Sequence, residues 1–255
     1  MNKNLLPLLA VAAAFVLAAC DKKTEGTETA APATAAAPAE IMPAAAANPA
    51  LLSPEKATEK APEVFKVRFA TTKGDMLVEV HRAWSPLGAD RIYNLVKIGY
   101  FDGNAFFRVM TGFMGQVGIH GDTAVSAKWR DARIQDDPIG QQSNKPGTVT
   151  FATCGPHCRS TQIFFNIGDN AGLDGQGFTP FGKIIEGADI PAKLNAEYGG
   201  SAVDQGNLQY QGNSYLKANL PNLDYIKAAR LVPKDGLDPL PRPPRAPTPR
   251  GLHIC

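Results

Sequence analysis

Hydrophobic and polar residues alternate along residues 64–80 with the period of two that is typical of β-strands. Phe65, Val67 and Phe69 fall on one face of the first run, and the lysine and arginine between them fall on the other. Residues 72–75 have the composition of a turn, and a second alternating run follows at residues 76–80. This pattern predicts a β-hairpin.

A helical pattern follows the hairpin. Ser85 and Pro86 provide an N-cap and a first helical residue, and Gly99 provides a stop. The apolar stripe between them is formed by Ala89, Ile92, Leu95 and Val96. The spacing predicts a helix over about residues 86–98, which leads directly into another strand.

Strands dominate the rest of the predicted domain. We expect them at residues 148–153, 162–167, 178–185 and 225–232, with a second helix over about residues 188–198. A short helical piece after Gly212 ends before Pro221, and the stretches 118–146 and 168–177 are predicted to be loops. These elements predict a mainly antiparallel sheet, closed or nearly so, with two main helices covering its openings.

The N-terminal residues have the pattern of a targeting segment. Lys3 is followed by an apolar run over residues 5–17, which is too short for the roughly 20 helical residues that span a bilayer. Residues 1–19 are therefore predicted to be a signal peptide. Small residues directly before Cys20 resemble the lipobox of bacterial lipoproteins, which implies that Cys20 is lipidated. An ordinary signal peptide followed by a chance cysteine is the alternative.

Two segments lack the apolar residues that a core requires. Residues 20–62 are rich in alanine and proline and are predicted to be a disordered tether. Residues 234–255 are rich in proline and arginine and are predicted to be a disordered tail, either a solvated basic end or a ligand for aromatic grooves. One domain remains between them, over residues 63–233.

Charge and motif content exclude several kinds of function. Lysine and arginine number 26 against 24 acidic residues, and no basic patch with interleaved aromatic residues occurs, so nucleic acid is not an expected partner. The loop at residues 169–180 lacks the ligand pattern of a calcium site, because Ala171 and Pro180 occupy ligand positions. No phosphate-binding loop or nucleophile elbow is present, and the four histidines are scattered. We expect no cofactor and no metal.

The run from Phe106 to Gly118 carries the strongest chemical signal. Arg108 and Gln116 are set among phenylalanine, methionine and valine residues, and three glycines recur at a spacing of three. A cation and an amide beside an apolar surface can hold a neutral, apolar group through its carbonyl. The alternative is an amphipathic strand with a snorkelling arginine.

Two cysteines are close together after a predicted strand. Cys154 and Cys158 are separated by three residues, so they do not form the two-residue spacing of a thioredoxin motif. A small-loop disulfide, two free thiols, and a soft-metal site completed by His157 are all consistent with this spacing. Cys255 stands alone at the end of the chain.

In order along the chain, these motifs resemble those of the cyclophilins, a family of peptidyl-prolyl cis-trans isomerases. The resemblance is strong over about residues 64–191 and weaker to about residue 232. The family's first signature falls on Phe106, Arg108, Gly112, Phe113, Met114, Gln116 and Gly118. The second falls on Ala152, Thr153, Gln162 and Phe164, and the third falls on Leu173, Asp174, Gly175, Phe181 and Gly182.

The resemblance implies a mainly β fold, a closed antiparallel eight-stranded barrel capped by two helices. It implies that Arg108 and Gln116 are catalytic residues that contact the peptide backbone around the prolyl bond. The residues that it implies for substrate binding are Phe113, Met114, Ala152, Thr153, Gln162, Phe164, Leu173 and Phe178. Of these, Ala152 and Thr153 would pair with the substrate chain.

Three positions depart from the family's usual pattern. Gly172 stands where many members have tryptophan, Phe178 is the nearest counterpart of a common histidine, and Cys154 replaces a small residue. These departures concern substrate preference and rate more than the type of reaction.

The resemblance implies an enzyme that accelerates the rotation of X-Pro bonds in proline-containing polypeptides, working as a monomer. With the signal peptide, it implies a lipid-anchored protein of the cell envelope that faces the periplasm, in either membrane. One alternative is a module that binds proline-containing segments, or acts as a chaperone, without catalysis. Another is a thiol-handling or metal-handling protein that uses Cys154 and Cys158.

Overall fold

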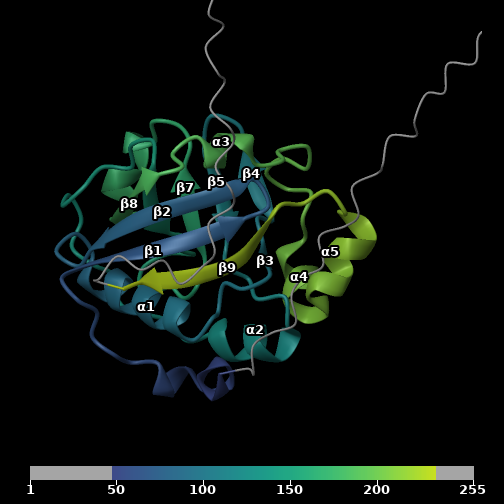
Figure 1. Ribbon diagram of the computed structural model, residues 1–255, viewed down its shortest axis with the longest axis horizontal. Helices are drawn as coiled ribbons and strands as arrows, with labels where there is room; N and C mark the ends of the chain where they lie inside the picture. Colours follow the sequence, from purple (N-terminus) through teal and green to yellow (C-terminus); the bar gives the residue numbers. More distant parts are fainter. Residues whose placement is uncertain (1–47, 234–255) are drawn as a thin grey trace, which may run out of the picture. The chain divides into compact units, whose positions relative to one another are not determined.

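The computed structural model describes residues 48–233 (Figure 1). They belong to the second of the two units into which the chain divides, Ile41–Cys255, and the first unit, Met1–Glu40, lies outside the described range. The predicted signal peptide, Cys20, the part of the predicted tether before residue 48 and the predicted tail at 234–255 also lie outside it.

The main element is one curled antiparallel sheet. Its strands are β1 (Val64–Thr71), β2 (Gly74–His81), β3 (Asn104–Ala105), β4 (Arg108–Met110), β5 (Met114–Val117), β6 (Thr148–Phe151), β7 (Ile163–Asn166), β8 (Pro180–Glu186) and β9 (Tyr225–Val232). They are ordered β3-β9-β1-β2-β8-β6-β7-β5-β4. The two edge strands, β3 and β4, are neighbours along the chain, so the sheet curls back toward its own beginning.

Helices flank this sheet. The α-helices are α1 (Pro86–Lys97), α2 (Thr123–Trp129), α3 (Ile190–Lys193), α4 (Gln205–Gln211) and α5 (Asn213–Asn219), and the 3-10 helices are η1 (Pro49–Leu52), η2 (Pro54–Lys56) and η3 (Ala171–Gln176). Figure 1 shows α4 and α5 together at one end of the molecule, beside the chain that leads into β9. In the described range no helix is long and apolar enough to cross a membrane.

The predicted architecture is confirmed as mainly β, but its details differ. The structure has nine strands instead of eight, and the observed pairings end at β3 and β4 without joining them into a closed barrel. The described residues contain five α-helices, whereas two main helices and one short helical piece after Gly212 were predicted; the short piece corresponds to α5. The first predicted hairpin is present, with Phe65 opposite Val80 and Phe69 opposite Met76.

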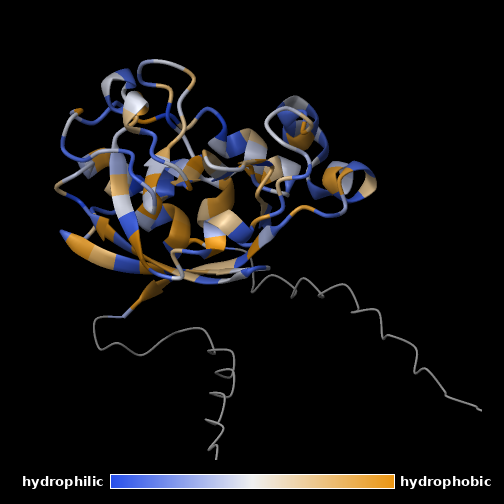
Figure 2. Cartoon of the chain, turned by 90° about the horizontal axis from the view of Figure 1, so that it is seen from above, coloured by the Kyte–Doolittle hydropathy of each residue, from blue (hydrophilic) through white to orange (hydrophobic). Residues whose placement is uncertain are grey.

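The core lies inside the curl of the sheet. Its centre is aromatic, because Phe69 makes edge-to-face contacts with Phe101 and Phe165 at ring separations of 6.0 and 5.5 Å. Figure 2 shows hydrophobic residues alternating with polar ones along the strands. A smaller cluster, which includes Phe107 and Leu216, lies beneath α4 and α5.

Helix α1 begins where the sequence predicted, but Ser85 does not cap it with its side chain. The cap is Asp137, whose Oδ1 accepts from the backbone N–H of Leu87 at 2.8 Å and whose Oδ2 accepts from that of Gly88 at 2.9 Å. The Ser85 hydroxyl donates to the same carboxylate. Arg159 pairs with Asp137 at 2.9 Å, and both side chains are almost fully buried. A distant loop therefore supplies the start of this helix.

One helix of the structure lies in a predicted loop, one lies where no element is predicted, and one predicted helix is short. Helix α2 occupies part of the stretch 118–146 and is capped by Asp122, whose carboxylate accepts from the backbone N–H of Ala124 and Val125. Helix α4 has only one fully buried residue, Leu208, so it lacks an apolar stripe. The predicted helix at 188–198 ends at Lys193, since Asp224 accepts the N–H of Asn195 at 2.6 Å and redirects the chain.

Residues 48–62, which the sequence analysis assigned to the tether, are part of the folded structure. Glu59 exchanges two hydrogen bonds between its backbone and the side chain of Asn94, at 3.0 and 2.7 Å. The indole N–H of Trp129 donates to the carbonyl of Leu51 at 2.9 Å. This segment, called the N-terminal strap below, therefore packs on α1 and α2. The composition of the strap did not predict this packing, because the residues that it contacts lie far along the sequence.

Candidate active site

The hairpin of β4 and β5 sets two polar side chains beside each other. Arg108 lies directly opposite Gln116 in the strand register, and Gln116 lies opposite Phe164 of β7. The Arg108 Nη1 group donates to Gln116 Oε1 at 3.2 Å, and Gln116 Nε2 donates to Gln162 Oε1 at 2.8 Å. Gln116 is buried, so these bonds fix the orientation of its amide.

A second contact holds Arg108 from the other side. Its Nε group donates to the backbone carbonyl of Gly200 at 3.1 Å, across 92 residues of sequence. A guanidinium carries five N–H donors, and these contacts use two of them. In the part of the chain that the structure describes, no carboxylate forms an ion pair with Arg108 and no further acceptor takes its remaining three N–H groups. The role of Gly200 gave no signal in the sequence.

Arg108, Gln116 and Gln162 line a cleft of about 540 Å³. One end of it is apolar and is lined by Phe113, Met114, Phe164, Leu173 and Phe178. Phe164 and Phe178 meet edge to face at a ring separation of 5.9 Å. A small, apolar ring would be desolvated here, with the guanidinium of Arg108 at the same cleft.

The backbone after β6 forms another wall. Ala152 and Thr153 line the cleft, and the N–H of Ala152 donates to the carbonyl of Gln162 at 2.9 Å. The hydroxyl of Thr153 bonds to Gly155, which holds the turn that follows. The cleft therefore brings together all ten residues that the sequence analysis named as catalytic or substrate-binding.

A polar cluster supports the loops at the apolar end. Asn144 donates to the carbonyl of Phe178 at 2.7 Å and to Asp174 Oδ1 at 2.8 Å. Ser143 donates to Asp174 Oδ2 at 2.5 Å. Desolvation opposes ionisation of Asp174, but hydrogen bonds from Ser143 and Asn144 outweigh it and lower its pKa below the ordinary value. Asp174 thus connects the loop of Leu173 to the segment that holds Phe178.

Two departures from the family pattern belong to this end: Gly172 precedes the lining residue Leu173, and Phe178 is itself a lining residue. A Cβ atom added at Gly172 would meet no atom within 4 Å, so the position is open. Phe178 has a place in the apolar wall, against Phe164, where a histidine would present a polar ring.

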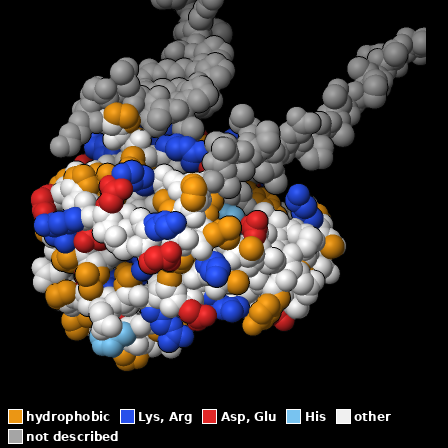
Figure 3. All heavy atoms as spheres, turned by 90° about the horizontal axis from the view of Figure 1, so that it is seen from below, with side chains coloured by type: hydrophobic (Ala, Val, Ile, Leu, Met, Phe, Trp, Pro, Cys, Tyr) orange, Lys and Arg blue, Asp and Glu red, His pale blue; other side chains and the backbone are white. Residues whose placement is uncertain are grey.

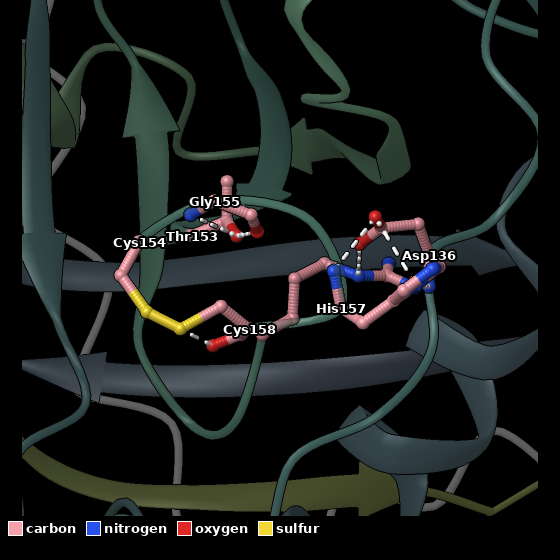
Figure 4. The surroundings of a disulfide bond; sticks show 7 residues. Asp136, Thr153, Cys154, Gly155, His157 and Cys158 are labelled. Carbon is pink, nitrogen blue, oxygen red and sulfur yellow. Dashed lines mark hydrogen bonds and ion pairs between the residues drawn. A yellow bond between two sulfur atoms is a disulfide. The ribbon is translucent and has the colours of Figure 1, made fainter.

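A disulfide lies beside the cleft and contributes to its lining. It joins Cys154 to Cys158 across a tight loop (Figure 4). His157, with a positive φ of 56°, turns away from the sulfur atoms. Its Nδ1 accepts from the N–H of Asp136 at 3.1 Å, and its own N–H donates to Asp136 Oδ2 at 2.8 Å.

This arrangement bears on the other interpretations of the cysteine pair. The two sulfur atoms are bonded to each other, and His157 faces Asp136 (Figure 4). Among the residues described, no group of three or more histidine, cysteine, aspartate or glutamate side chains could hold a metal ion. The loop also begins at the end of a strand, not at the start of a helix as in a thioredoxin motif.

The far end of the cleft contains residues that the sequence analysis did not identify. They come from α2, the loop after it and α4, and they include Ser126, Arg130, Asp131, Arg133, Gln205 and Gln209. The Asp122 cap with Val125 and Trp129 four residues apart is a signal that could have revealed α2. For α4 the only such signal is Asp204, whose side chain accepts from the N–H of Asn207.

The arrangement suits binding and charge stabilisation rather than proton transfer. The one carboxylate that lines the cleft, Asp131, has a side chain that is 69% exposed. Tyr100 also lines it, but burial raises the pKa of its hydroxyl well above the ordinary value. The described residues of the cleft therefore include no pair of groups suited to general acid–base catalysis near neutral pH.

Comparisons with known proteins agree with this geometry. Residues 66–211 match the model of a family described as cyclophilin type peptidyl-prolyl cis-trans isomerase/CLD. A peptidyl-prolyl cis-trans isomerase of Acinetobacter baylyi is 30% identical over 133 residues, which are 50% of this chain and 70% of that protein. One from Streptomyces antibioticus is 32% identical over 145 residues, 53% of this chain and 86% of that protein.

The fold is also shared with a solved structure. The crystal structure of a cyclophilin-type peptidyl-prolyl cis-trans isomerase from Cryptosporidium parvum matches with a TM-score of 0.51 and 18% identity. The match covers 66% of this chain and 97% of that chain.

Proposed function

This chain belongs to the cyclophilin-type peptidyl-prolyl cis-trans isomerases, and we propose that it catalyses X-Pro rotation in this cleft with Arg108 as the essential donor. The observation that carries the proposal is that, among the described residues, Arg108 is held at two of its N–H groups while three remain uncommitted, beside the apolar end of the cleft.

The physical problem is the partial double bond of the prolyl amide. Its rotation barrier is about 18–20 kcal/mol. Rotation breaks the resonance, so the twisted amide is less polar and its nitrogen gains a free lone pair. An apolar wall of Phe113, Met114 and Phe164 disfavours the more polar planar form, and so it helps the bond to leave that form.

Arg108 acts on the twisted state. A donor near the ring nitrogen gains an acceptor only when resonance is lost, and such differential binding raises the rate. A hydrogen bond from a charged group is worth about 1.5–3 kcal/mol, which corresponds to about a ten- to a hundredfold change in rate. Gln116 and Gln162 keep the guanidinium in place, and the edge at Ala152 and Thr153 holds the chain on one side of the bond.

The test is an isomerisation assay on a short X-Pro peptide with Arg108→Ala beside the wild type. We expect kcat/KM to fall about ten- to a hundredfold, because the charged donor to the twisted amide is lost. Lys227→Ala removes an exposed cation from β9 and is the matched control. Equal rates for Arg108→Ala and wild type would disprove the role of Arg108.

The alternative is a module that binds proline-containing segments without useful turnover. It would bind the peptide with a measurable affinity while the isomerisation rate stayed at the uncatalysed value. The uncommitted donors of Arg108 favour catalysis, since binding alone does not require a guanidinium kept free for an acceptor.

We also propose that the enzyme acts on cell-envelope proteins, as a monomer tethered through a lipid on Cys20 and facing the periplasm. The support is the signal-peptide pattern and the cysteine that follows it, together with the Cys154–Cys158 disulfide, which suits an oxidising compartment. The test is membrane fractionation of a Cys20→Ser variant. Release of that variant from the membrane fraction is expected, and retention equal to that of the wild type would contradict the anchor.

A further inference from the structure

The cleft extends well beyond the apolar end that a proline ring requires. Its far end is polar and is built by two short helices, α2 and α4, with the loop after α2. Isomerisation of the prolyl bond uses none of these side chains. They are therefore available to contact other parts of a bound polypeptide.

The charge of the cleft is concentrated and positive. Three guanidinium groups line it, those of Arg108, Arg130 and Arg133, against one carboxylate, that of Asp131. Three positive charges and one negative charge leave an excess of two, as large as the formal net charge of the whole chain. Figure 3 shows one face of the molecule, on which positive and negative side chains are interspersed.

Neither arginine at the far end is neutralised by a close, buried partner. The Nε of Arg130 lies 3.7 Å from the exposed carboxylate of Asp131, which leaves that carboxylate largely hydrated. Arg133 is exposed, and no carboxylate of the described residues lies within ion-pair distance of it. Both cations are therefore able to pair with a charge brought by a ligand.

Helix α4 gives Arg130 a defined position. Its guanidinium lies over the ring of Tyr210, with 5.3 Å from Cζ to the ring centroid, and its Nη1 approaches Gln209 Oε1 at 3.4 Å. Stacking on an aromatic ring restrains a guanidinium but leaves its N–H edges free. Gln205 and Gln209 add amide groups that can bond to carboxylate or carbonyl oxygens.

We propose that the far end of the cleft is a subsite for an acidic side chain, so that the preferred substrates carry glutamate or aspartate close to the isomerised proline. The polypeptide would run from the proline at the apolar end, along Ala152 and Thr153, to Arg130 and Arg133. This inference rests on the proposed function and specifies its substrate class. It adds the residues of α2 and α4 as determinants of specificity.

The first experiment compares peptides that differ at one position. Glutamate, glutamine or lysine is placed two residues before the proline in one series and two residues after it in a second series. In one of the two series we expect kcat/KM for the glutamate peptide to exceed that for the lysine peptide by about three- to tenfold, as for exposed ion pairs. Raising the salt concentration should shrink this ratio.

The second experiment assigns the effect to the subsite. Arg133→Gln should reduce the glutamate-to-lysine ratio about two- to fivefold. Lys128→Gln is the control, because Lys128 is an exposed cation on α2 that does not line the cleft. That variant should keep the wild-type ratio. Equal ratios for the two variants would overturn the proposal, because the effect would then come from the overall charge of the protein and not from a local contact.

The outcome separates this inference from the proposed function. Wild-type turnover with a glutamate-to-lysine ratio of one in both series overturns the subsite and leaves the isomerase mechanism standing. Peptide affinities are measured in parallel. These affinities test the subsite even if Arg108 does not act as proposed. If glutamate peptides bind more tightly than lysine peptides and Arg133→Gln abolishes this difference, the subsite is supported. Equal affinities overturn it.

Discussion

At the scale of single residues, Asp174 shows how one carboxylate organises an apolar pocket that it does not enter. It receives three hydrogen bonds from Ser143 and Asn144, and Asn144 in turn holds the backbone of Phe178. The walls contributed by Leu173 and Phe178 therefore depend on a polar cluster behind them. Such clusters are sensitive to the charge of their acceptor.

The stability of this cluster should depend on pH. The folded-state pKa of Asp174 is lowered, so its stabilising contribution is fully present above the unfolded pKa of about 3.9 and is lost as pH falls through the folded pKa. Asp174→Asn should lower the free energy of unfolding by about 1–2 kcal/mol at neutral pH. Denaturant titrations should show this difference shrinking toward about pH 2. A difference that is the same at both pH values would contradict the role of the charge.

At the scale of elements, the start of α1 depends on a residue from another part of the chain. Asp137 accepts hydrogen bonds from two backbone N–H groups of the helix and from Arg159, while its side chain is 1% exposed. Because Arg159 is also buried, the pair joins the helix to the segment before β7. Removal of one partner leaves a buried charge without compensation.

Asp137→Ala should therefore be strongly destabilising. We expect the free energy of unfolding to fall by about 3–5 kcal/mol. The matched variant Asp122→Ala removes the exposed cap of α2 and should cost only about 1 kcal/mol. Chemical denaturation measures the free energy of unfolding of both variants. A loss for Asp137→Ala no larger than that for Asp122→Ala would show that the buried pair contributes little.

The loop closed by Cys154 and Cys158 is a second element whose stability can be predicted. A disulfide that closes a loop of this size should stabilise the fold by about 2 kcal/mol, by restricting the unfolded chain. Reductant should therefore lower the unfolding midpoint of the wild type. The variant with serine at both positions should start at the lower midpoint and show no response to reductant. Midpoints of the wild type that are equal with and without reductant would contradict the prediction.

At the scale of the whole molecule, the folded unit begins before its sheet. The N-terminal strap contributes Ala50 and Ala61 to the core, and its backbone bonds to Asn94 and Trp129. Residues that precede β1 are therefore part of the folded core.

The strap should unfold with the domain and not before it. Asn94→Ala removes both bonds to Glu59 and should lower the free energy of unfolding by about 2–3 kcal/mol. Backbone amides of residues 50–61 should then exchange with solvent faster than in the wild type. Asn219→Ala, which removes an exposed side chain from α5, serves as the control. Amide exchange rates of residues 50–61 that are equal in Asn94→Ala and in the wild type would show that the strap is not held through this contact.

The sequence by itself determined the features that depend on neighbouring residues. The alternation in β1 and β2 predicted a hairpin, because side chains of a strand point to opposite faces. The stripe between Pro86 and Lys97 predicted α1, because helical residues three and four apart share a face. The resemblance of the motifs to those of the cyclophilins also implied the ten residues that line the cleft, since a motif is a local feature of the sequence.

The tertiary structure alone decided which distant groups meet. The carbonyl of Gly200 holds Arg108 across 92 residues, and Asp137 replaces Ser85 as the cap of α1 from 49 residues away. The polar end of the cleft depends on α2 and α4; α2 shows only one pair of buried apolar residues at helical spacing, Val125 and Trp129, and α4 has a single buried residue, Leu208. The physical reason is that periodicity records which face of an element is buried, whereas hydrogen-bond partners and charges across a cleft depend on how the whole chain folds.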